Sequence, residues 1–181
     1  MKWCLSFLVF FISLSVYPQQ NFSILNGRAY DKTETYPSID SFHKKFKYLI
    51  TFQTVSNWFG APSINFLLLK RGGHLFAYKG NDYTYSQCAK LNISQDSLIA
   101  LWNGLVANNL FILKTDNELT HNCPTNIFDC GAYKFVLIHK SKMKTLYYAC
   151  PELYMKYCDD IDERKNITAC ALLIMKVTGK L

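Results

Sequence analysis

The segment His121–Gly131, with the sequence HNCPTNIFDCG, carries the residue types most able to do chemistry. A histidine beside two cysteines could bind zinc, because Cys and neutral His are among its usual ligands. A thiolate near a histidine base could instead act as a nucleophile. In an oxidising compartment, Cys123 and Cys130 could form a disulfide. The choice among these chemistries depends on the compartment and on the other cysteines.

The N-terminus has the pattern of a secretory signal peptide. Lys2 is followed by an apolar run, Leu5–Ile12, and then by small residues that suit cleavage after Ser15. The run is shorter than the roughly 20 residues of a membrane-spanning helix, so we expect no stable span after cleavage. Cys4 precedes the run and cannot be a lipoprotein acceptor. We predict a signal peptide at 1–15 and a secreted or periplasmic protein; an uncleaved anchor is the alternative.

An even number of cysteines remains after the signal peptide, and in an exported chain this predicts a disulfide framework. They are Cys88, Cys123, Cys130, Cys150, Cys158 and Cys170. A helix beginning at Pro151 would hold Cys150 and Cys158 about 12 Å apart, beyond the roughly 7 Å limit of a disulfide. Cys123 with Cys130 is the easiest local pair. We predict this bond in preference to a metal site, because zinc knuckles use more closely spaced cysteines.

Apolar periodicity and turn residues predict two hairpins and several helices. The predicted strands lie at about 64–71, 74–79, 132–140 and 143–149. Gly72-Gly73 suits the first hairpin turn. Residues 38–59 read as a helix running into a strand. A helix is predicted after the N-cap Ser94. A short helix is predicted from Pro151, and a separate final helix is predicted to end at about Val177.

These elements predict an α+β fold. We expect an antiparallel sheet of four to five strands, made of two hairpins, with helices packed on one face in ββα-ββα order. Residues 16–37 are polar and lack periodicity, so they predict an extended N-terminal arm. Residues 38–181 are predicted to form a single α+β domain.

The stretch from Asn65 to Tyr157 resembles small exported domains of bacteria, particularly Bacteroidota. These domains have a hairpin with a glycine turn, a helix, a cysteine-containing loop, a strand pair and a short helix. The matching pieces are Leu67–Tyr78, Leu98–Phe111, Cys123–Gly131, Tyr133–Tyr148 and Pro151–Tyr154. No activity is established for such domains, so the resemblance implies an architecture and no catalytic residues.

The formal charge is +7, but the basic residues are spread along the chain. Lys140, Lys142 and Lys144 alternate, and we interpret them as a solvated hairpin face. A nucleic-acid site would need a denser footprint, so no specific nucleic-acid binding is expected. The chain lacks the Gly-x-Ser-x-Gly elbow of hydrolases and the glycine-rich nucleotide-binding motifs. We therefore predict no catalytic residue, metal or cofactor.

Asn21, Asn92 and Asn166 begin Asn-x-Ser/Thr sequons, which would be glycan acceptors in a eukaryotic host. Overall we expect an exported, disulfide-containing binding or structural protein for an unidentified protein or envelope partner. One alternative is a small thiol- or metal-dependent enzyme that uses His121, Cys123 and Cys130. Another is a carrier that holds a small ligand against its sheet. The sequence does not indicate the oligomeric state.

Overall fold

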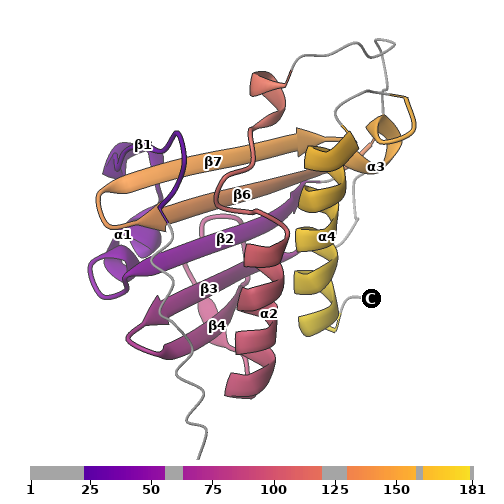
Figure 1. The fold of residues 1–181 in the computed structure, drawn as a ribbon. Helices are drawn as coiled ribbons and strands as arrows, with labels where there is room; N and C mark the ends of the chain where they lie inside the picture. Colours follow the sequence, from indigo (N-terminus) through magenta and orange to yellow (C-terminus); the bar gives the residue numbers. More distant parts are fainter. Residues whose placement is uncertain (1–22, 56–62, 120–129, 158–160, 180–181) are drawn as a thin grey trace, which may run out of the picture.

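The computed structural model describes residues 23–55, 63–119, 130–157 and 161–179. One antiparallel sheet crosses the molecule in the strand order β1-β7-β6-β2-β3-β4-β5 (Figure 1). Its strands are β1 (Arg28–Ala29), β2 (Tyr48–Val55), β3 (Asn65–Arg71), β4 (His74–Gly80), β5 (Cys88–Lys90), β6 (Ala132–His139) and β7 (Lys142–Ala149). The helices are α1 (Pro37–His43), α2 (Gln95–Ala107), α3 (Pro151–Tyr154) and α4 (Ile161–Val177), with 3-10 turns η1 (Lys32–Glu34) and η2 (Asp116–Glu118).

The α+β class and both predicted hairpins, β3–β4 and β6–β7, are confirmed. The predicted four to five strands are too few, because the sheet has seven. The ββα-ββα order is also wrong, since β2 precedes the first hairpin and lies between the two hairpins in space. The two overlooked strands, β1 and β5, have two and three residues. Strands this short show no alternation in the sequence.

Local signals fixed the turns and helix ends. Gly72 has φ +59°, the left-handed conformation that a tight hairpin turn requires. Ser94 caps α2 by accepting a hydrogen bond from the backbone N–H of Ser97. Asn109, just beyond the C-cap of α2, has φ +58°. Glycine and asparagine adopt the left-handed conformation most easily, and serine is a favoured N-cap. The sequence therefore carries signals for these boundaries.

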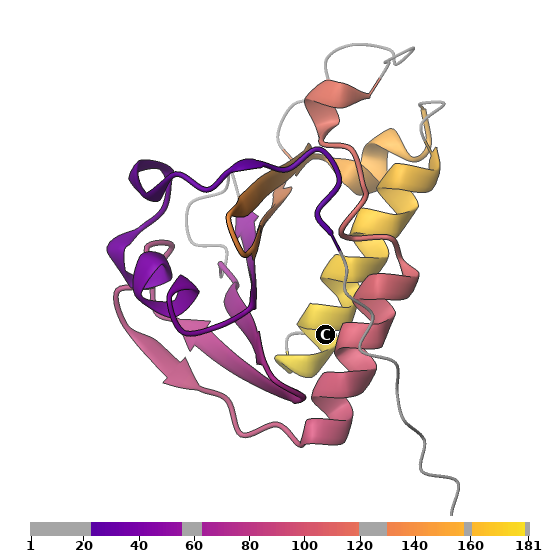
Figure 2. The same ribbon diagram turned by 60° about the vertical axis from the view of Figure 1, so that its left-hand side comes forward.

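Helices α2 and α4 pack side by side on one face of the sheet and cover the main core (Figures 1 and 2). Each helix buries one apolar stripe. Leu98, Trp102 and Leu105 of α2 are buried, and so are Ile167, Ala171 and Ile174 of α4. They contact a buried row of aromatic and aliphatic strand residues that includes Phe52, Phe66 and Phe135. None of the helices in the described ranges has the length and apolar character to cross a membrane.

The prediction that helices cover only one face is wrong, because α1 lies on the opposite face (Figure 2). Ile39 of α1 packs in a second apolar cluster with Leu49, Leu69 and Ile138. In the region predicted to be an extended arm, Ile24 is buried in the main core and β1 pairs with β7. The signal peptide and the start of the arm lie outside the described residues.

The prediction that Lys140, Lys142 and Lys144 form a solvated face is wrong for Lys144. Its side chain is 5% exposed, and its ammonium donates to the carbonyl oxygens of Leu25 at 3.2 Å and Leu113 at 2.6 Å. Lys144 pairs with Leu137 across the β6–β7 ladder and therefore points to the α2–α4 side. Lys140 lies in the turn with φ +53°. Lys144 thus attaches two loop segments to β7.

Arg164 is a second buried cation on this side of the sheet. It is fully buried in α4, and its Nη2 lies 2.8 Å from Asp116 Oδ1 in η2. The guanidinium also stacks over Tyr154, 4.6 Å from the ring centroid. This ion pair fixes η2 against α4.

From the environment of His139 we predict that the stability of the protein depends on pH. The buried ring of His139 stacks on Tyr48, with the centroids 4.0 Å apart. Burial lowers the pKa of His139 from its ordinary value of 6.5, and Lys140 and Lys47 lower this pKa further. The folded state therefore favours the neutral ring. The contribution of His139 to stability is complete above the unfolded pKa and is lost as the pH falls through the lowered folded pKa.

We expect the free energy of unfolding to fall between about pH 7 and about pH 5. In His139→Phe, which keeps an aromatic ring against Tyr48, this fall should be smaller. Replacing the exposed His74 by glutamine is the control and should leave the pH profile unchanged. Urea unfolding at several pH values measures the effect. A His139→Phe profile equal to that of the wild type would contradict this assignment.

Candidate functional site

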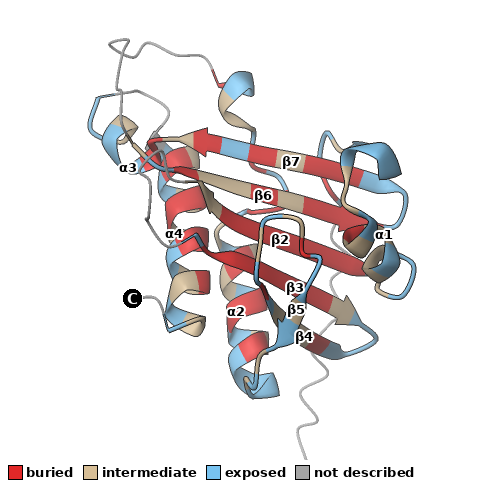
Figure 3. Cartoon of the chain, turned by 180° about the vertical axis from the view of Figure 1, so that it is seen from behind, coloured by how far each residue is buried: buried red, intermediate tan, exposed pale blue. Residues whose placement is uncertain are grey.

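Among the described elements, no helix lies over one half of the sheet face that carries α1 (Figure 3). A groove of about 660 Å³ lies there, and a recess of about 50 Å³ adjoins it under α1. We call the larger space the open groove. Its lining residues are Tyr36, Gln53, Thr54, Val55, Ser63, Asn65, Asn81, Asp82, Tyr83, Lys134 and Tyr147.

The strand register builds the floor of the open groove. Tyr147 of β7 pairs with Lys134 of β6, Lys134 with Gln53 of β2, and Gln53 with Asn65 of β3. Paired residues on adjacent strands point to the same face. Strands lie about 4.8 Å apart, so this polar row extends about 14 Å across the sheet.

The same face is apolar at its other end. Leu49 lies four residues before Gln53 in β2, and Ile138 lies four residues after Lys134 in β6. Both pack beneath α1. Residues two apart in a strand share a face. One face therefore changes from an apolar, covered half to a polar, open half along the strands. This change is the feature that marks the open half as a candidate site.

The β4–β5 loop forms one wall of the open groove. Gln53 Nε2 donates to the carbonyl oxygen of Tyr83 at 2.7 Å. Ser38 Oγ donates to the carbonyl oxygen of Thr84 at 2.7 Å. The rings of Tyr36 and Tyr83 meet edge to face, with centroids 5.9 Å apart. The loop is thus attached to both the sheet and α1, and the wall is preorganised.

Asp82 organises this loop from within. Its carboxylate accepts hydrogen bonds from the Thr84 backbone N–H at 2.8 Å and from the Thr84 hydroxyl at 2.6 Å. The Ser86 hydroxyl donates to its other oxygen at 2.5 Å. These bonds lower the pKa of Asp82 to about 2. Asp82 therefore stays ionised and is a structural group rather than a proton donor or acceptor near neutral pH.

Tyr85 anchors the end of the loop below the surface. It adopts φ +56°, and its buried hydroxyl lies 3.2 Å from the carbonyl oxygen of Phe52 and 3.3 Å from that of Phe66. Burial raises the pKa of Tyr85, so the hydroxyl keeps its proton. The ring packs in the cluster under α1 and lines the small recess beside the open groove.

Lys134 is the one basic residue among the described residues that line the open groove. Among the residues that the structure describes, none forms an ion pair or hydrogen bond with its ammonium. A lysine placed in a polar row without a protein partner is available to an anionic group of a ligand.

The cysteine prediction needs correction. Cys130 pairs with Cys150, not with Cys123, and the two Cα atoms are 5.3 Å apart. The β6–β7 register explains this bond, because Ala132 pairs with Ala149 and so brings the flanking cysteines together. Cys130 therefore has no thiol to offer as a nucleophile or zinc ligand. His121, Cys123 and Cys158 lie outside the described residues.

Two further predicted disulfide candidates are free thiols, Cys88 and Cys170. They cannot pair, because Cys88 packs with the cluster under α1 and Cys170 with the core under α2 and α4. Burial raises the pKa of Cys170 to about 12. Burial and the nearby Asp82 also raise the pKa of Cys88. Neither thiol is activated as a nucleophile.

Within the described residues, no three His, Cys, Asp or Glu side chains are placed to hold a metal ion. Of the sequons, Asn92 is exposed just before α2, Asn166 is half-buried in α4, and Asn21 lies outside the described residues. The described lining of the open groove consists of tyrosine rings, amides, hydroxyls, one carboxylate, one lysine and one valine, and these polar groups can hold a polar ligand.

The sequence did not single out the residues of the open groove. Gln53, Asn65 and Lys134 lie on three different strands and look like ordinary surface positions in the sequence. The available signal was their position near strand ends, with Gln53 near the C-terminal end of β2 and Asn65 and Lys134 near the N-terminal ends of β3 and β6. Its use requires the strand order. Comparison of the chain with known protein families and with curated proteins finds no match.

Proposed function

We propose that this chain is an exported binding protein and that the open groove is its binding site. The observation that carries the proposal is the half-covered sheet face, where the polar row Tyr147–Lys134–Gln53–Asn65 lies beside a preorganised wall. Binding sites combine a largely preformed concave surface with a few placed polar groups, and the open groove has both.

The proposed location outside the cytosol has two supports. The disulfide Cys130–Cys150 fits an extracytoplasmic protein, because structural disulfides persist in oxidising compartments. The N-terminal sequence supports export through a signal peptide at 1–15. Cleavage of this segment belongs to the proposal.

The open groove supports a polar ligand better than the apolar cargo of a sheet-lined carrier. Lys134 and the exposed Tyr83 line it with an ammonium and a hydroxyl. An apolar molecule placed there would remove these groups from water without replacing the lost hydrogen bonds. The interpretation as a thiol enzyme loses one of its named residues, because Cys130 is in a disulfide.

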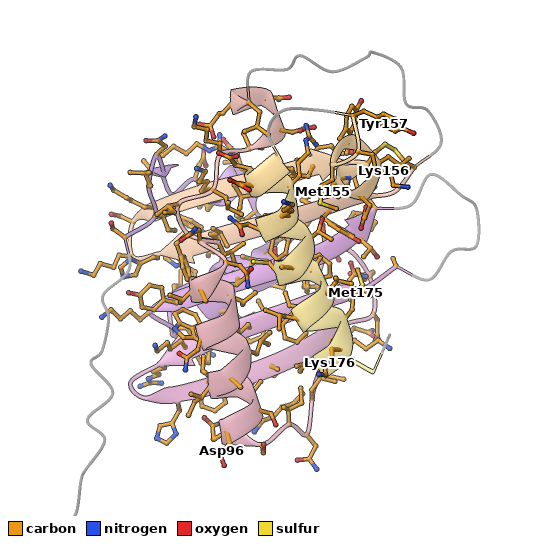
Figure 4. All side chains as sticks on the ribbon, turned by 45° about the vertical axis from the view of Figure 1, so that its right-hand side comes forward. Asp96, Met155, Lys156, Tyr157, Met175 and Lys176 are labelled. Atoms are coloured by element: carbon orange, nitrogen blue, oxygen red, sulfur yellow. A yellow bond between two sulfur atoms is a disulfide. The ribbon has the colours of Figure 1, made fainter. Side chains whose placement is uncertain are left out.

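A capture experiment with matched variants tests the proposal. The groove variant carries Lys134→Glu and Tyr83→Ser. The control variant carries the same changes at Lys156 and Tyr157, which follow α3 and do not line the open groove (Figure 4). Immobilised wild type and both variants are exposed to extracellular and envelope material of the native host. We expect the wild type and the control to recover the same ligand and the groove variant to lose it.

A further inference from the structure

We propose that the open groove binds an acidic oligosaccharide. This inference rests on the proposed binding function and names the chemical class of its ligand. The lining residues that carry it are Gln53, Asn65, Asn81, Tyr83, Lys134 and Tyr147. They fall into three kinds of side chain, and each kind matches one property of an acidic sugar chain.

The amides match the hydroxyl groups. Gln53, Asn65 and Asn81 each carry an acceptor oxygen and a donor NH₂ group. One N–H of Gln53 donates to the Tyr83 carbonyl and one of Asn81 to Gln87, and an NH₂ group has a second N–H to donate. A sugar hydroxyl also donates and accepts, so it can pair with either end of an amide. Gln53 and Asn65 are neighbours in the β2–β3 register and offer such pairs side by side. Charged side chains would satisfy only one of the two roles of a hydroxyl.

The tyrosines match the C–H faces of sugar rings. Tyr83 is 64% exposed and Tyr147 is 43% exposed, although both are large aromatic residues. A tyrosine has an apolar face and a polar tip, and it loses little conformational entropy when it binds. Tyr147 lies at one end of the polar row, and Tyr83 lies on the wall above Gln53. A flat ligand can lie between them.

Lys134 supplies the charge complementarity. Its ammonium lies in the middle of the row, between Tyr147 and Gln53. One lysine matches one carboxylate, sulfate or phosphate substituent on an otherwise neutral chain. The other charged lining residue, Asp82, is held by Thr84 and Ser86 of its own loop. The open groove thus favours a sparsely charged ligand over a dense polyanion.

Two other polymers fit less well. Tight binding of a nucleic acid needs several phosphate contacts, and the described lining of the open groove contains a single basic residue. An extended peptide gains affinity by hydrogen bonding to a free strand edge. The open groove instead lies on the sheet face, where β2 and β6 already pair with strands on both sides. A ligand there must bind to side chains, as a sugar does.

The test uses the full secreted chain and a panel of oligosaccharides bearing uronate, sulfate or sialic acid, each with its neutral counterpart. An oligoglutamate peptide and oligodeoxythymidine are the competing ligands. We expect at least one acidic oligosaccharide to bind, measured by calorimetry. Lys134→Gln should weaken this binding about tenfold and leave the neutral counterpart unchanged. Tyr83→Ser should weaken both, and the matched control Lys156→Gln should change neither.

Three results would overturn the inference. They are the absence of binding to every oligosaccharide, equal or tighter binding of oligoglutamate or oligodeoxythymidine, and acidic-sugar binding that Lys134→Gln leaves unchanged. If no oligosaccharide binds but the groove variant still loses the ligand in the capture experiment, only the ligand class is wrong. If the groove variant captures as the wild type does, the proposed function itself is wrong.

Discussion

Replacing Asp116 by alanine should lower the free energy of unfolding by about 3 kcal/mol, measured by urea denaturation. Asp116 pairs with Arg164, whose side chain is 1% exposed. Without Asp116, the guanidinium remains in the interior with no ion-pair partner among the described residues. Nη1 and Nε of Arg164 also lack hydrogen-bond partners within this part of the chain.

Two controls distinguish a buried ion pair from ion pairs in general. Glu34→Ala breaks the exposed pair with Arg28 and should change stability by at most about 1 kcal/mol. The double variant Asp116→Ala with Arg164→Met removes both charges and should be much more stable than Asp116→Ala alone. Similar small losses for Asp116→Ala and Glu34→Ala would contradict the proposed role of Asp116 in fixing η2 to α4.

Removal of the disulfide should have an effect of similar size. Cys130 and Cys150 are 20 residues apart, and a loop of this length corresponds to about 3 kcal/mol of stabilisation through the unfolded state. We therefore expect Cys130→Ala with Cys150→Ala to lower the free energy of unfolding by about this amount. Thermal unfolding with and without reductant measures the same effect in the wild type.

Cys88→Ala is the matched control, because Cys88 is a free, partly buried thiol. It should change stability by less than about 1 kcal/mol. In the double alanine variant, reductant should lower stability less than it does in the wild type. A double variant as stable as the wild type would show that the bond adds nothing to the strand pairing that already holds the β6–β7 ends together.

The sequence predicted the elements that depend on neighbouring residues. Gly72 and Ser94 act within one turn, and the apolar stripes of α2 and α4 repeat within one helix. Each is therefore visible in a short window of sequence. For the same reason both hairpins and the helix-to-strand transition from α1 to β2 were predicted correctly.

Features that depend on pairing between residues far apart in the sequence could not be predicted. The central position of β2 follows from its pairing with both hairpins, and the partner of Cys130 follows from the register of β6 with β7. Lys144 looked like a solvated lysine because the segments that cover it, around Leu25 and Leu113, are far from it in sequence. The open groove combines residues from all of these elements, so its prediction required the complete topology.

The amount of ligand recovered by the groove variant, relative to wild type, tests the central claim most directly. That claim is that the polar, uncovered half of the sheet face binds the ligand of this protein. We predict that Lys134→Glu with Tyr83→Ser recovers at least about tenfold less of the ligand than wild type does. The control with the same changes at Lys156 and Tyr157 should recover as much as wild type. Equal recovery by all three proteins would contradict the claim.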